Sequence, residues 1–326
     1  DVACIGELLI DFVALEKNKP LSEVPFFACL PGGAPANVAV ALQRLGALTA
    51  SFVGKVGNDP FGDKLLRTLE GEGVTVSNLA VDPHARTTVV FDGVWEDGRK
   101  DTCFYRGADT LLRFQDICRF EELQSAACVH YGSVVLTDEN SPTANTQQHT
   151  LHQLRKQCPQ IMMSYDPNYR PSLWSNKDKA HAVIFDNFKL AHLVKISEEE
   201  FEVATGHCDF PHGIQAVLEE GVELVVVSRG RKGAIASNGQ CIVESPGLGS
   251  LSILETTGAG DAFMAALISK LLPTYQKHGS LKSLGEKPIK RALDYANVVG
   301  GLACTKRGAI PALPYQVEVE QYLGRL

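Results

Sequence analysis

The sequence of 326 residues lacks any hydrophobic run long enough to cross a membrane. Its richest apolar stretch, residues 262–272, is short and contains Lys270. A secretory signal is also missing, because Asp1 leads directly into a strand-like run at residues 2–5. We therefore expect no membrane partner and a cytoplasmic location. An organelle stays open, because the sequence has no initiator Met and a targeting peptide could have been removed.

Positive charge is scarce as well. The chain has 31 Lys and Arg against 38 Asp and Glu, which gives a formal net charge of -7. Surfaces that bind nucleic acid are normally basic, so this balance argues against a nucleic-acid partner. Any site for a phosphate group must then be local.

Paired cysteines are absent too. The nine Cys residues are scattered, with no C-x-x-C pair and no spacing typical of a metal site. Such dispersed thiols fit a reducing compartment, in which most of them act as small buried apolar residues. The chain also has no G-x-x-x-x-G-K-[ST] motif, so a P-loop nucleotide site is not expected.

What the sequence does contain is an alternation of strand-like and helix-like segments, which predicts an α/β fold with a mostly parallel central sheet and helices on both faces. Helices are expected to begin at the cap-then-proline pairs Asp59-Pro60 and Ser141-Pro142. Apolar strands covered on both sides are expected at residues 51–56, 128–136, 161–165, 191–196 and 224–228.

Two stretches break this alternation. Residues 12–30 and 86–106 read as consecutive strands, the second with a turn at Asp97-Gly98. They predict a small β-sheet lid that excludes water from a site, although an antiparallel extension of the main sheet fits the pattern equally well. The predicted division is an α/β domain of residues 1–11, 31–85 and 108–326 and a β lid of residues 12–30 and 86–107.

Residues 255–263 read ETTGAGDAF and place flexible backbone before an apolar helix expected at residues 262–272. Gly258, Ala259 and Gly260 leave that backbone open to an anion, which the free amides and the dipole of a helix start attract. Asp261 could take the proton of an attacking hydroxyl while these amides bind a phosphoryl group. A plain helix cap is the alternative.

A second glycine-rich segment, residues 31–42, reads PGGAPANVAVAL and opens a helix that should end near Gly46. Gly32 and Gly33 let a ligand touch the backbone, and Asn37 offers both a donor and an acceptor from the first turn. Hydroxyl-rich ligands such as sugars need that mixed capacity. Taken alone, the segment could equally be a plain loop into a buried helix.

Together these two segments resemble the two signatures of the pfkB (ribokinase-like) family of sugar and nucleoside kinases, and the similarity extends from Gly6 to Pro311. Within the family, GELLIDF at residues 6–12, YDPNYRP at 165–171 and RGAIPALP at 307–314 most resemble fructokinases. The resemblance implies a ribokinase-like fold with a small β-sheet lid. It also implies ATP-dependent phosphorylation of a sugar primary hydroxyl, first of all D-fructose to fructose 6-phosphate.

Other activities share the same scaffold. A 2-keto-3-deoxygluconate kinase, an aminoimidazole riboside kinase or another nucleoside kinase would use the same Asp261. A protein that binds sugar or nucleotide as a sensor, without catalysis, is the alternative from a different class.

The resemblance assigns Asp261 as the general base, with Gly258, Ala259 and Gly260 as the anion hole. Further candidates follow the strand at residues 161–165, at the carboxyl end where ligands of doubly wound sheets gather. The sugar-binding candidates are Asp11, Gly32, Gly33, Asn37, Arg106, Asp166, Asn168 and Arg170. A turn cap at Asp11, a structural turn at residues 166–168 and a solvated Arg106 are the alternatives.

By the same resemblance, the nucleotide would be bound by Ser197, Glu200, Ser228, Gly230, Gly233 and Asn297, with Glu200 linked through water to Mg²⁺. Ser197 and Glu200 also form a Ser-x-x-Glu capping box, and residues 228–233 could be a hairpin turn. The implied cofactors are therefore ATP and Mg²⁺.

Relatives often carry Asp at the position of Glu255, in a loop associated with a monovalent cation. The longer side chain of Glu changes the reach of the carboxylate, so K⁺ is left open. Lid strands in this family often pair between subunits, which implies a homodimer through the lid.

Overall fold

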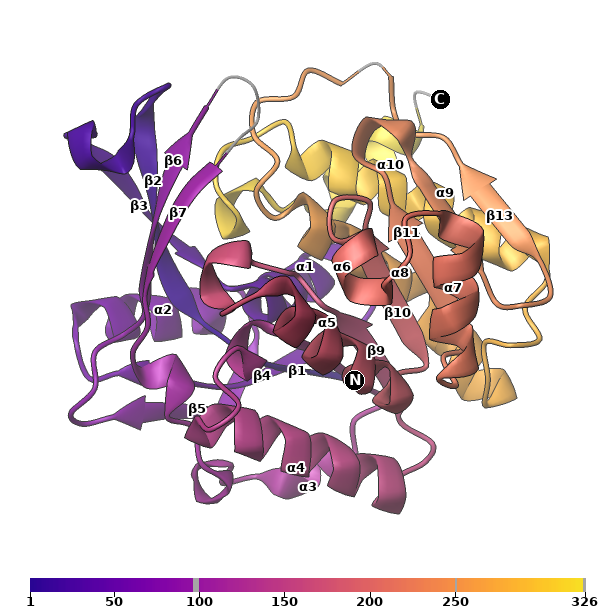
Figure 1. Cartoon of the computed structure of the whole chain (residues 1–326), viewed down its shortest axis with the longest axis horizontal. Coiled ribbons are helices and arrows are strands. Elements are labelled where there is room, and N and C mark those ends of the chain that lie inside the picture. Colours follow the sequence, from indigo (N-terminus) through magenta and orange to yellow (C-terminus); the bar gives the residue numbers. More distant parts are fainter. Residues whose placement is uncertain (96–99, 250, 325–326) are drawn as a thin grey trace.

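The computed structural model describes residues 1–95, 100–249 and 251–324 (Figure 1). Its centre is a nine-stranded sheet of order β13-β12-β11-β10-β9-β8-β1-β4-β5. All neighbours from β11 to β5 pair in parallel, and β12 and β13 join one edge as antiparallel strands. The predicted mostly parallel sheet is therefore confirmed. Its strands are β1 (Val2–Ile5), β4 (Ala50–Gly57), β5 (Thr75–Asp82), β8 (Cys128–Gly132), β9 (Met162–Asp166), β10 (Leu193–Ser197), β11 (Leu224–Ser228), β12 (Ala234–Ser237) and β13 (Ile242–Ser245).

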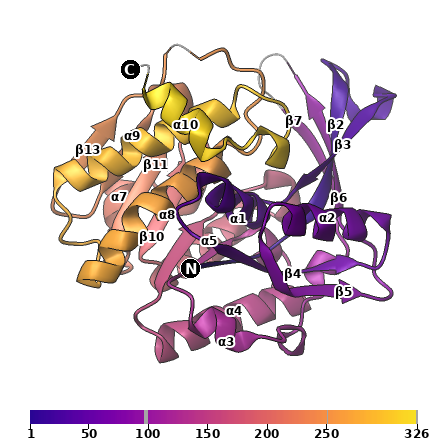
Figure 2. The same ribbon diagram turned by 180° about the vertical axis from the view of Figure 1, so that it is seen from behind.

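Helices cover both faces of this sheet. The face seen in Figure 1 carries α3 (Phe120–Gln124), α4 (Pro142–Gln157), α5 (Lys177–Asp186), α6 (Phe201–Thr205) and α7 (Phe210–Glu219). The opposite face, seen in Figure 2, carries α1 (Ala34–Leu45), α2 (Pro60–Gly71), α8 (Ala259–His278), α9 (Glu286–Ala303) and α10 (Gln316–Leu323). Each set closes a separate apolar core against the sheet, because parallel strands are apolar on both faces.

A smaller sheet of order β3-β2-β6-β7 stands at the side of the main body (Figure 1). Its strands are β2 (Leu9–Lys17), β3 (Phe27–Gly32), β6 (Val89–Val94) and β7 (Lys100–Tyr105). The predicted small sheet is present, and we refer to these four strands as the lid. The turn predicted at Asp97-Gly98 lies outside the described residues, and the domain boundaries given above remain predictions.

Two predicted elements have different bounds in the structure. The strand expected at 128–136 ends at Gly132, because Ser133 has a helical backbone conformation and Val134–Leu136 form a 3-10 helix. The helix expected at 262–272 begins at Ala259 and runs to His278. Gly258 precedes it with a φ of 79°, a left-handed conformation from which the chain can turn straight into the helix.

The predicted helix starts at Asp59 and Ser141 are confirmed. The Asp59 carboxylate accepts the amides of Phe61 and Gly62, and the Ser141 hydroxyl accepts that of Ala144. In the part of the chain that the structure describes, no helix is both long and apolar enough to span a membrane.

Candidate active site

The two glycine-rich segments meet at their helix starts. Asn37, in the first turn of α1, donates its side-chain amide to Asp261 Oδ2 at 2.7 Å, although the two residues are 224 positions apart. Asn37 is only 4% exposed, and its Oδ1 has no hydrogen-bond partner among the described residues. Buried polar atoms are normally paired, so this oxygen is a candidate acceptor for a ligand hydroxyl.

The pKa of Asp261 lies not far below neutral pH. Burial raises its pKa to about 6, and the hydrogen bond from Asn37 limits that rise. The Asp166 carboxylate raises the pKa further, while Lys195 and Arg170 lower it. At pH 7 most of the Asp261 carboxylate is therefore ionised and able to accept a proton.

The backbone around Gly258 and Gly260 is tightly enclosed. A Cβ atom on Gly258 would lie 3.1 Å from Ala309 Cα, and one on Gly260 would lie 3.1 Å from Lys195 Nζ. Ala259, the third predicted member of the anion hole, donates its amide to Thr256 O at 3.2 Å. The small residues thus let the first turn of α8 pack against neighbouring groups, and the Ala259 amide is already used within that turn, which argues against its place in an anion hole.

Asp11 lies against the glycine-rich loop before α1. A Cβ atom on Gly32 would come within 2.0 Å of Asp11 Oδ2, and one on Gly33 within 2.4 Å of Glu7 O. Gly33 also has a φ of 111°, which other residues rarely adopt. These contacts place the Asp11 carboxylate at the loop that leads to Asn37.

Glu7 is a site residue that the sequence reasoning missed. It is 3% exposed, and its Oε1 accepts the Ala34 amide at 2.8 Å, so it binds the first residue of α1. Burial raises the pKa of Glu7 to about 7 despite that hydrogen bond. A carboxylate directly after a buried strand, in the segment GELLIDF, was the available signal.

Arg106 is held at the end of the lid strand β7. Its Nε donates to Asp109 Oδ2 at 2.7 Å, and a terminal nitrogen donates to Val134 O at 3.1 Å. Asp109 is almost fully buried, so the expectation of a merely solvated arginine is wrong. The guanidinium is fixed in place, and its field lowers the pKa of Glu7.

Asp166 ends β9 and forms a buried ion pair. Its Oδ2 lies 2.9 Å from Lys195 Nζ, and both side chains are 6% exposed. Sequence reasoning missed Lys195, although a lysine inside the apolar strand β10 was a visible anomaly. Asn168 has a φ of 50° and donates its amide to Asp166 Oδ1 at 3.3 Å, whereas Arg170 is exposed.

Glu200 connects the carboxyl ends of two strands. Its Oε1 accepts the Ser197 amide at 2.7 Å, and its Oε2 accepts the Tyr169 amide at 2.6 Å. The predicted capping box is therefore only half right, since α6 begins at Phe201 and Glu200 itself is its N-cap residue. The second carboxylate oxygen binds the loop after β9 instead, which ties the Asp166 loop to β10.

The predicted nucleotide residues lie near this edge of the sheet. Ser197 and Ser228 are register partners on β10 and β11, and residues 230–233 turn into the antiparallel strand β12. A Cβ atom on Gly233 would lie 2.0 Å from Ser245 O, so a close backbone approach demands glycine there. Asn297 donates to Ser245 Oγ at 2.8 Å from α9. Gly233 and Asn297 therefore both lie against Ser245.

Glu255 has one satisfied and one unsatisfied oxygen. Its Oε2 accepts the Gly308 amide at 3.2 Å, while its buried Oε1 has no partner within the described ranges. A carboxylate oxygen without a hydrogen-bond partner is the kind of donor that a hard cation takes. Glu255 Oε1 is therefore compatible with binding a monovalent cation.

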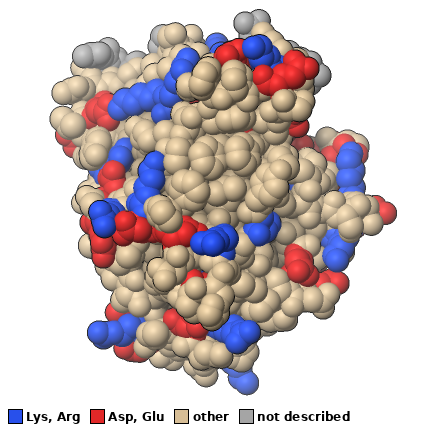
Figure 3. Space-filling view, turned by 90° about the vertical axis from the view of Figure 1, so that its left-hand side faces the viewer, with Lys and Arg blue, Asp and Glu red and all other residues tan. Residues whose placement is uncertain are grey.

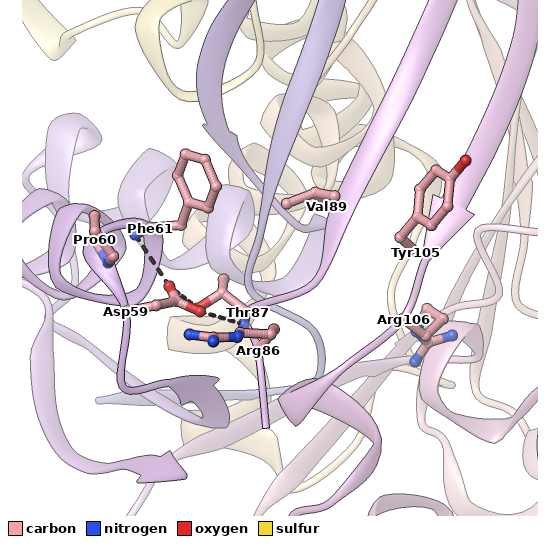
Figure 4. Close-up of a pocket in the computed structure, with 8 residues that line it drawn as sticks. All are labelled: Asp59, Pro60, Phe61, Arg86, Thr87, Val89, Tyr105 and Arg106. Atoms are coloured by element: carbon pink, nitrogen blue, oxygen red, sulfur yellow. Dashed lines mark hydrogen bonds between the residues drawn. The ribbon is translucent and has the colours of Figure 1, made fainter. Parts of the chain in front are cut away.

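A cavity of about 400 Å³ opens at the base of the lid, between the start of α2 and strands β6 and β7 (Figure 4). In Figure 4, Phe61, Val89 and Tyr105 form its apolar side. Arg106 is the only predicted site residue among its lining, so this cavity does not mark the place where Asn37 meets Asp261. The lining residues are Asp59, Pro60, Phe61, Arg86, Thr87, Val89, Tyr105 and Arg106.

A family model described as pfkB family carbohydrate kinase matches residues 1–316. The chain belongs to the pfkB family of carbohydrate kinases. Among curated relatives, fructokinase-1 of Oryza sativa subsp. japonica is 37% identical over 323 residues, which cover 98% of this chain and 96% of the relative. Membership of this family confirms the predicted sugar kinase.

Solved structures of this family share the whole architecture. A fructokinase from Xylella fastidiosa with bound ATP superposes with a TM-score of 0.87 at 28% identity, covering 99% of this chain and 98% of its own. A fructokinase double mutant from Vibrio cholerae, bound to fructose, ADP and a potassium ion, gives 0.83 at 32% identity, with coverage of 99% and 97%. The predicted ribokinase-like fold is therefore confirmed.

Proposed function

We propose that this pfkB kinase transfers the γ-phosphoryl group of ATP to the primary hydroxyl of a sugar, with D-fructose as the first candidate and fructose 6-phosphate as the product. The observation that carries the proposal is the contact between Asn37 and Asp261. It joins a polar group suited to sugar hydroxyls with a partly buried carboxylate whose pKa is about 6, at the start of a helix.

In this proposal the sugar lies between the lid and the start of α1. Asp11 accepts hydroxyl hydrogens, Asn37 Oδ1 accepts another, and Gly32 and Gly33 allow the ring to approach the backbone. Arg106, Asp166, Asn168 and Arg170 complete the candidate sugar-binding set. The fructokinase names and the bound fructose among the relatives favour fructose over other acceptors.

For the transfer step, Asp261 accepts the proton of the attacking hydroxyl, whose oxygen bonds to the γ-phosphorus as the bond to ADP breaks. The amides of Gly258, Gly260 and Asp261 at the start of α8 are proposed to bind the charge that develops on the phosphoryl oxygens, since the Ala259 amide is already bonded to Thr256 O. Release of the proton from Asp261 to solvent resets the site.

The nucleotide is proposed to lie along the ends of β10 and β11. Its candidate contacts are Ser197, Glu200, Ser228, Gly230, Gly233 and Asn297. Among the described residues, no group of three or more His, Cys, Asp or Glu side chains could hold a metal ion. This fits Mg²⁺ that is held mainly by phosphate oxygens and water, with Glu200 as a distant partner. When bound, Mg²⁺ would neutralise phosphate charge.

Three finer assignments belong to the same proposal. Glu255 Oε1 is the candidate ligand for K⁺, the ion present in the Vibrio cholerae relative. A homodimer is proposed to form through the lid, whose outer side chains include exposed Leu15, Phe26 and Tyr105. The cytoplasm is the proposed location.

Measuring ATP consumption with separate acceptors tests this function directly. The panel contains fructose, ribose, 2-keto-3-deoxygluconate, aminoimidazole riboside and a purine nucleoside, each with ATP and Mg²⁺. The proposal expects the highest kcat/KM with fructose. Preference for another acceptor would overturn the assignment of the sugar, and nucleotide binding without turnover of any acceptor would favour a sensor.

A further inference from the structure

Lys195 lies at the centre of the candidate site but has no role in the steps described so far. It stands in β10 with 5% exposure. Its Nζ lies 2.9 Å from Asp166 Oδ2, and a Cβ atom on Gly260 would lie 3.1 Å from the same nitrogen. The lysine ammonium is thus enclosed between a carboxylate and the backbone of the first turn of α8.

The charges around this ammonium explain why a cation is needed there. The Asp166, Glu200 and Asp261 carboxylates all act on Lys195, and each one raises its pKa against the effect of burial. A phosphoryl group that enters the same region adds further negative charge. Without Lys195, the carboxylates would repel that group in a site where charges are poorly screened.

Other cations are less well placed to do this. Arg106 is paired with the buried Asp109, at the end of the lid. Arg170 acts on Asp261 but is exposed to solvent. The charged groups that face Asp261 are Asp166 on β9, Lys195 on β10 and Arg170 in the loop after β9. Lys195 is the buried cation among them.

We propose that Lys195 is a positioning residue for phosphoryl transfer, which neutralises Asp166 beneath the first turn of α8 and keeps Asp261 ionised. The inference rests on the proposed sugar kinase function. Lys195 therefore sets the charge of the site that receives the phosphoryl group. A Cβ atom at residue 260 would be in tight contact with the lysine nitrogen, so glycine there leaves the ammonium in place.

If the ion pair of Lys195 and Asp166 only stabilised the fold, its loss would not change the pH dependence of activity. Lys55 provides a matched control for this case. Lys55 is also a buried lysine, 8% exposed, and it forms ion pairs with Asp82 at 3.1 Å and Asp116 at 3.0 Å. No sugar or nucleotide candidate lies among its ion-pair partners. Lys55→Met therefore reproduces the loss of a buried ion pair without changing the charge beside Asp261.

The experiment compares Lys195→Met, Lys195→Arg and Lys55→Met with the unmodified enzyme over about pH 5 to 9. Lys195→Met is expected to lower kcat by about 10²-fold, to change the KM for the sugar only a few-fold, and to move the acidic limb of kcat/KM upward by about one pH unit. Lys195→Arg should restore part of kcat, and Lys55→Met should leave the limb in place. An unmoved limb in Lys195→Met, with a loss no larger than in Lys55→Met, would overturn the inference.

A second measurement does not depend on turnover. The Asp261 carboxyl can be titrated by carbon-13 NMR and assigned from the signal that Asp261→Asn removes. Lys195→Met should raise its titration midpoint, whereas Asp166→Asn, which removes a negative neighbour, should lower it. An unmoved midpoint in both variants contradicts the inference. Absence of turnover in the unmodified enzyme would instead contradict only the proposed kinase function.

Discussion

At the scale of single residues, two buried polar atoms of the candidate site have no hydrogen-bond partner in the described part of the chain, Asn37 Oδ1 and Glu255 Oε1. Such an atom costs about 1–3 kcal/mol of stability. Gln147 Oε1 and Thr150 Oγ1 in α4 also have no partner, so it is the position of the first two beside glycine-rich loops that makes them candidates for binding a ligand. Glu7 also lowers the stability of the fold when it is ionised, because burial disfavours its charged form and raises its pKa.

Glu7 gives a prediction about stability and pH. Its pKa is about 7 in the folded chain against an ordinary value of 4.5, so the folded state binds the Glu7 proton more tightly. The stabilisation from that proton is fully present below pH 4.5 and is lost as the pH rises through 7. Glu7→Gln removes this dependence, and should raise the free energy of unfolding at about pH 8, relative to about pH 4.5, by up to about 3 kcal/mol.

Urea unfolding of both proteins at the two pH values measures this difference. Asp63→Asn serves as the control, because Asp63 lies on the exposed surface of α2 in an ion pair with Arg67. An equal pH dependence in Glu7→Gln and the unmodified chain would show that folding does not raise the pKa of Glu7.

At the scale of elements, the start of α8 depends on the left-handed conformation of Gly258, with its φ of 79°. Gly258→Ala is expected to destabilise the fold by about 1–2 kcal/mol, because Ala disfavours this conformation and its Cβ would meet Ala309. Gly71, the last residue of α2, has open space around its Cα. Gly71→Ala should therefore stabilise by about 0.5–1 kcal/mol.

Thermal and denaturant unfolding of the two glycine variants provide the measurement. Opposite signs are expected for residues 258 and 71, with a loss of kinase activity only in Gly258→Ala. Equal effects of the two substitutions would show that the conformation before α8 is not a constraint.

The starts of two helices were predictable from the sequence, because hydrogen bonds between residues close in the chain determine them. Asp59 and Ser141 begin helices through hydrogen bonds to amides two or three residues away, so their patterns were sufficient. Glu200 shows what a local pattern cannot predict. One of its carboxylate oxygens accepts the Ser197 amide, as in a capping box, but the other accepts the amide of Tyr169, 31 residues away. No local pattern contains that second contact.

At the scale of the whole molecule, the fold class was predictable because strands and helices alternate along the chain and parallel sheets need that order. The contact between Asn37 and Asp261 was predictable only through the family resemblance. The pairs Asp166–Lys195 and Glu7–Ala34 were not predicted, because they depend on how separate strand ends and loops meet in three dimensions.

The face of the molecule that carries the lid is the surface through which we expect two copies of the chain to associate. Its upper part has an area without charged side chains, between charged groups at the top and a band of charged groups across the middle of the face (Figure 3). Leu15 and Phe26 lie on the lid and are 52% and 65% exposed. Large exposed apolar areas commonly mark interfaces, so a homodimer is expected. Phe26→Lys should shift sedimentation equilibrium toward the monomer.

Val317→Lys is the matched control for the dimer, because Val317 is 56% exposed on α10, outside the lid. It should leave the association unchanged. A monomer in the unmodified chain, or equal dissociation in both variants, would contradict assembly through the lid.

The central claim is that Asp261 accepts the proton of the sugar hydroxyl. The most direct measurement is the turnover of Asp261→Asn with fructose and ATP, together with the affinity for ATP from calorimetry. The account predicts that kcat falls by at least about 10²- to 10⁴-fold while ATP binding changes little, and that the unmodified enzyme loses kcat/KM below about pH 6. Near-normal turnover of Asp261→Asn would contradict it.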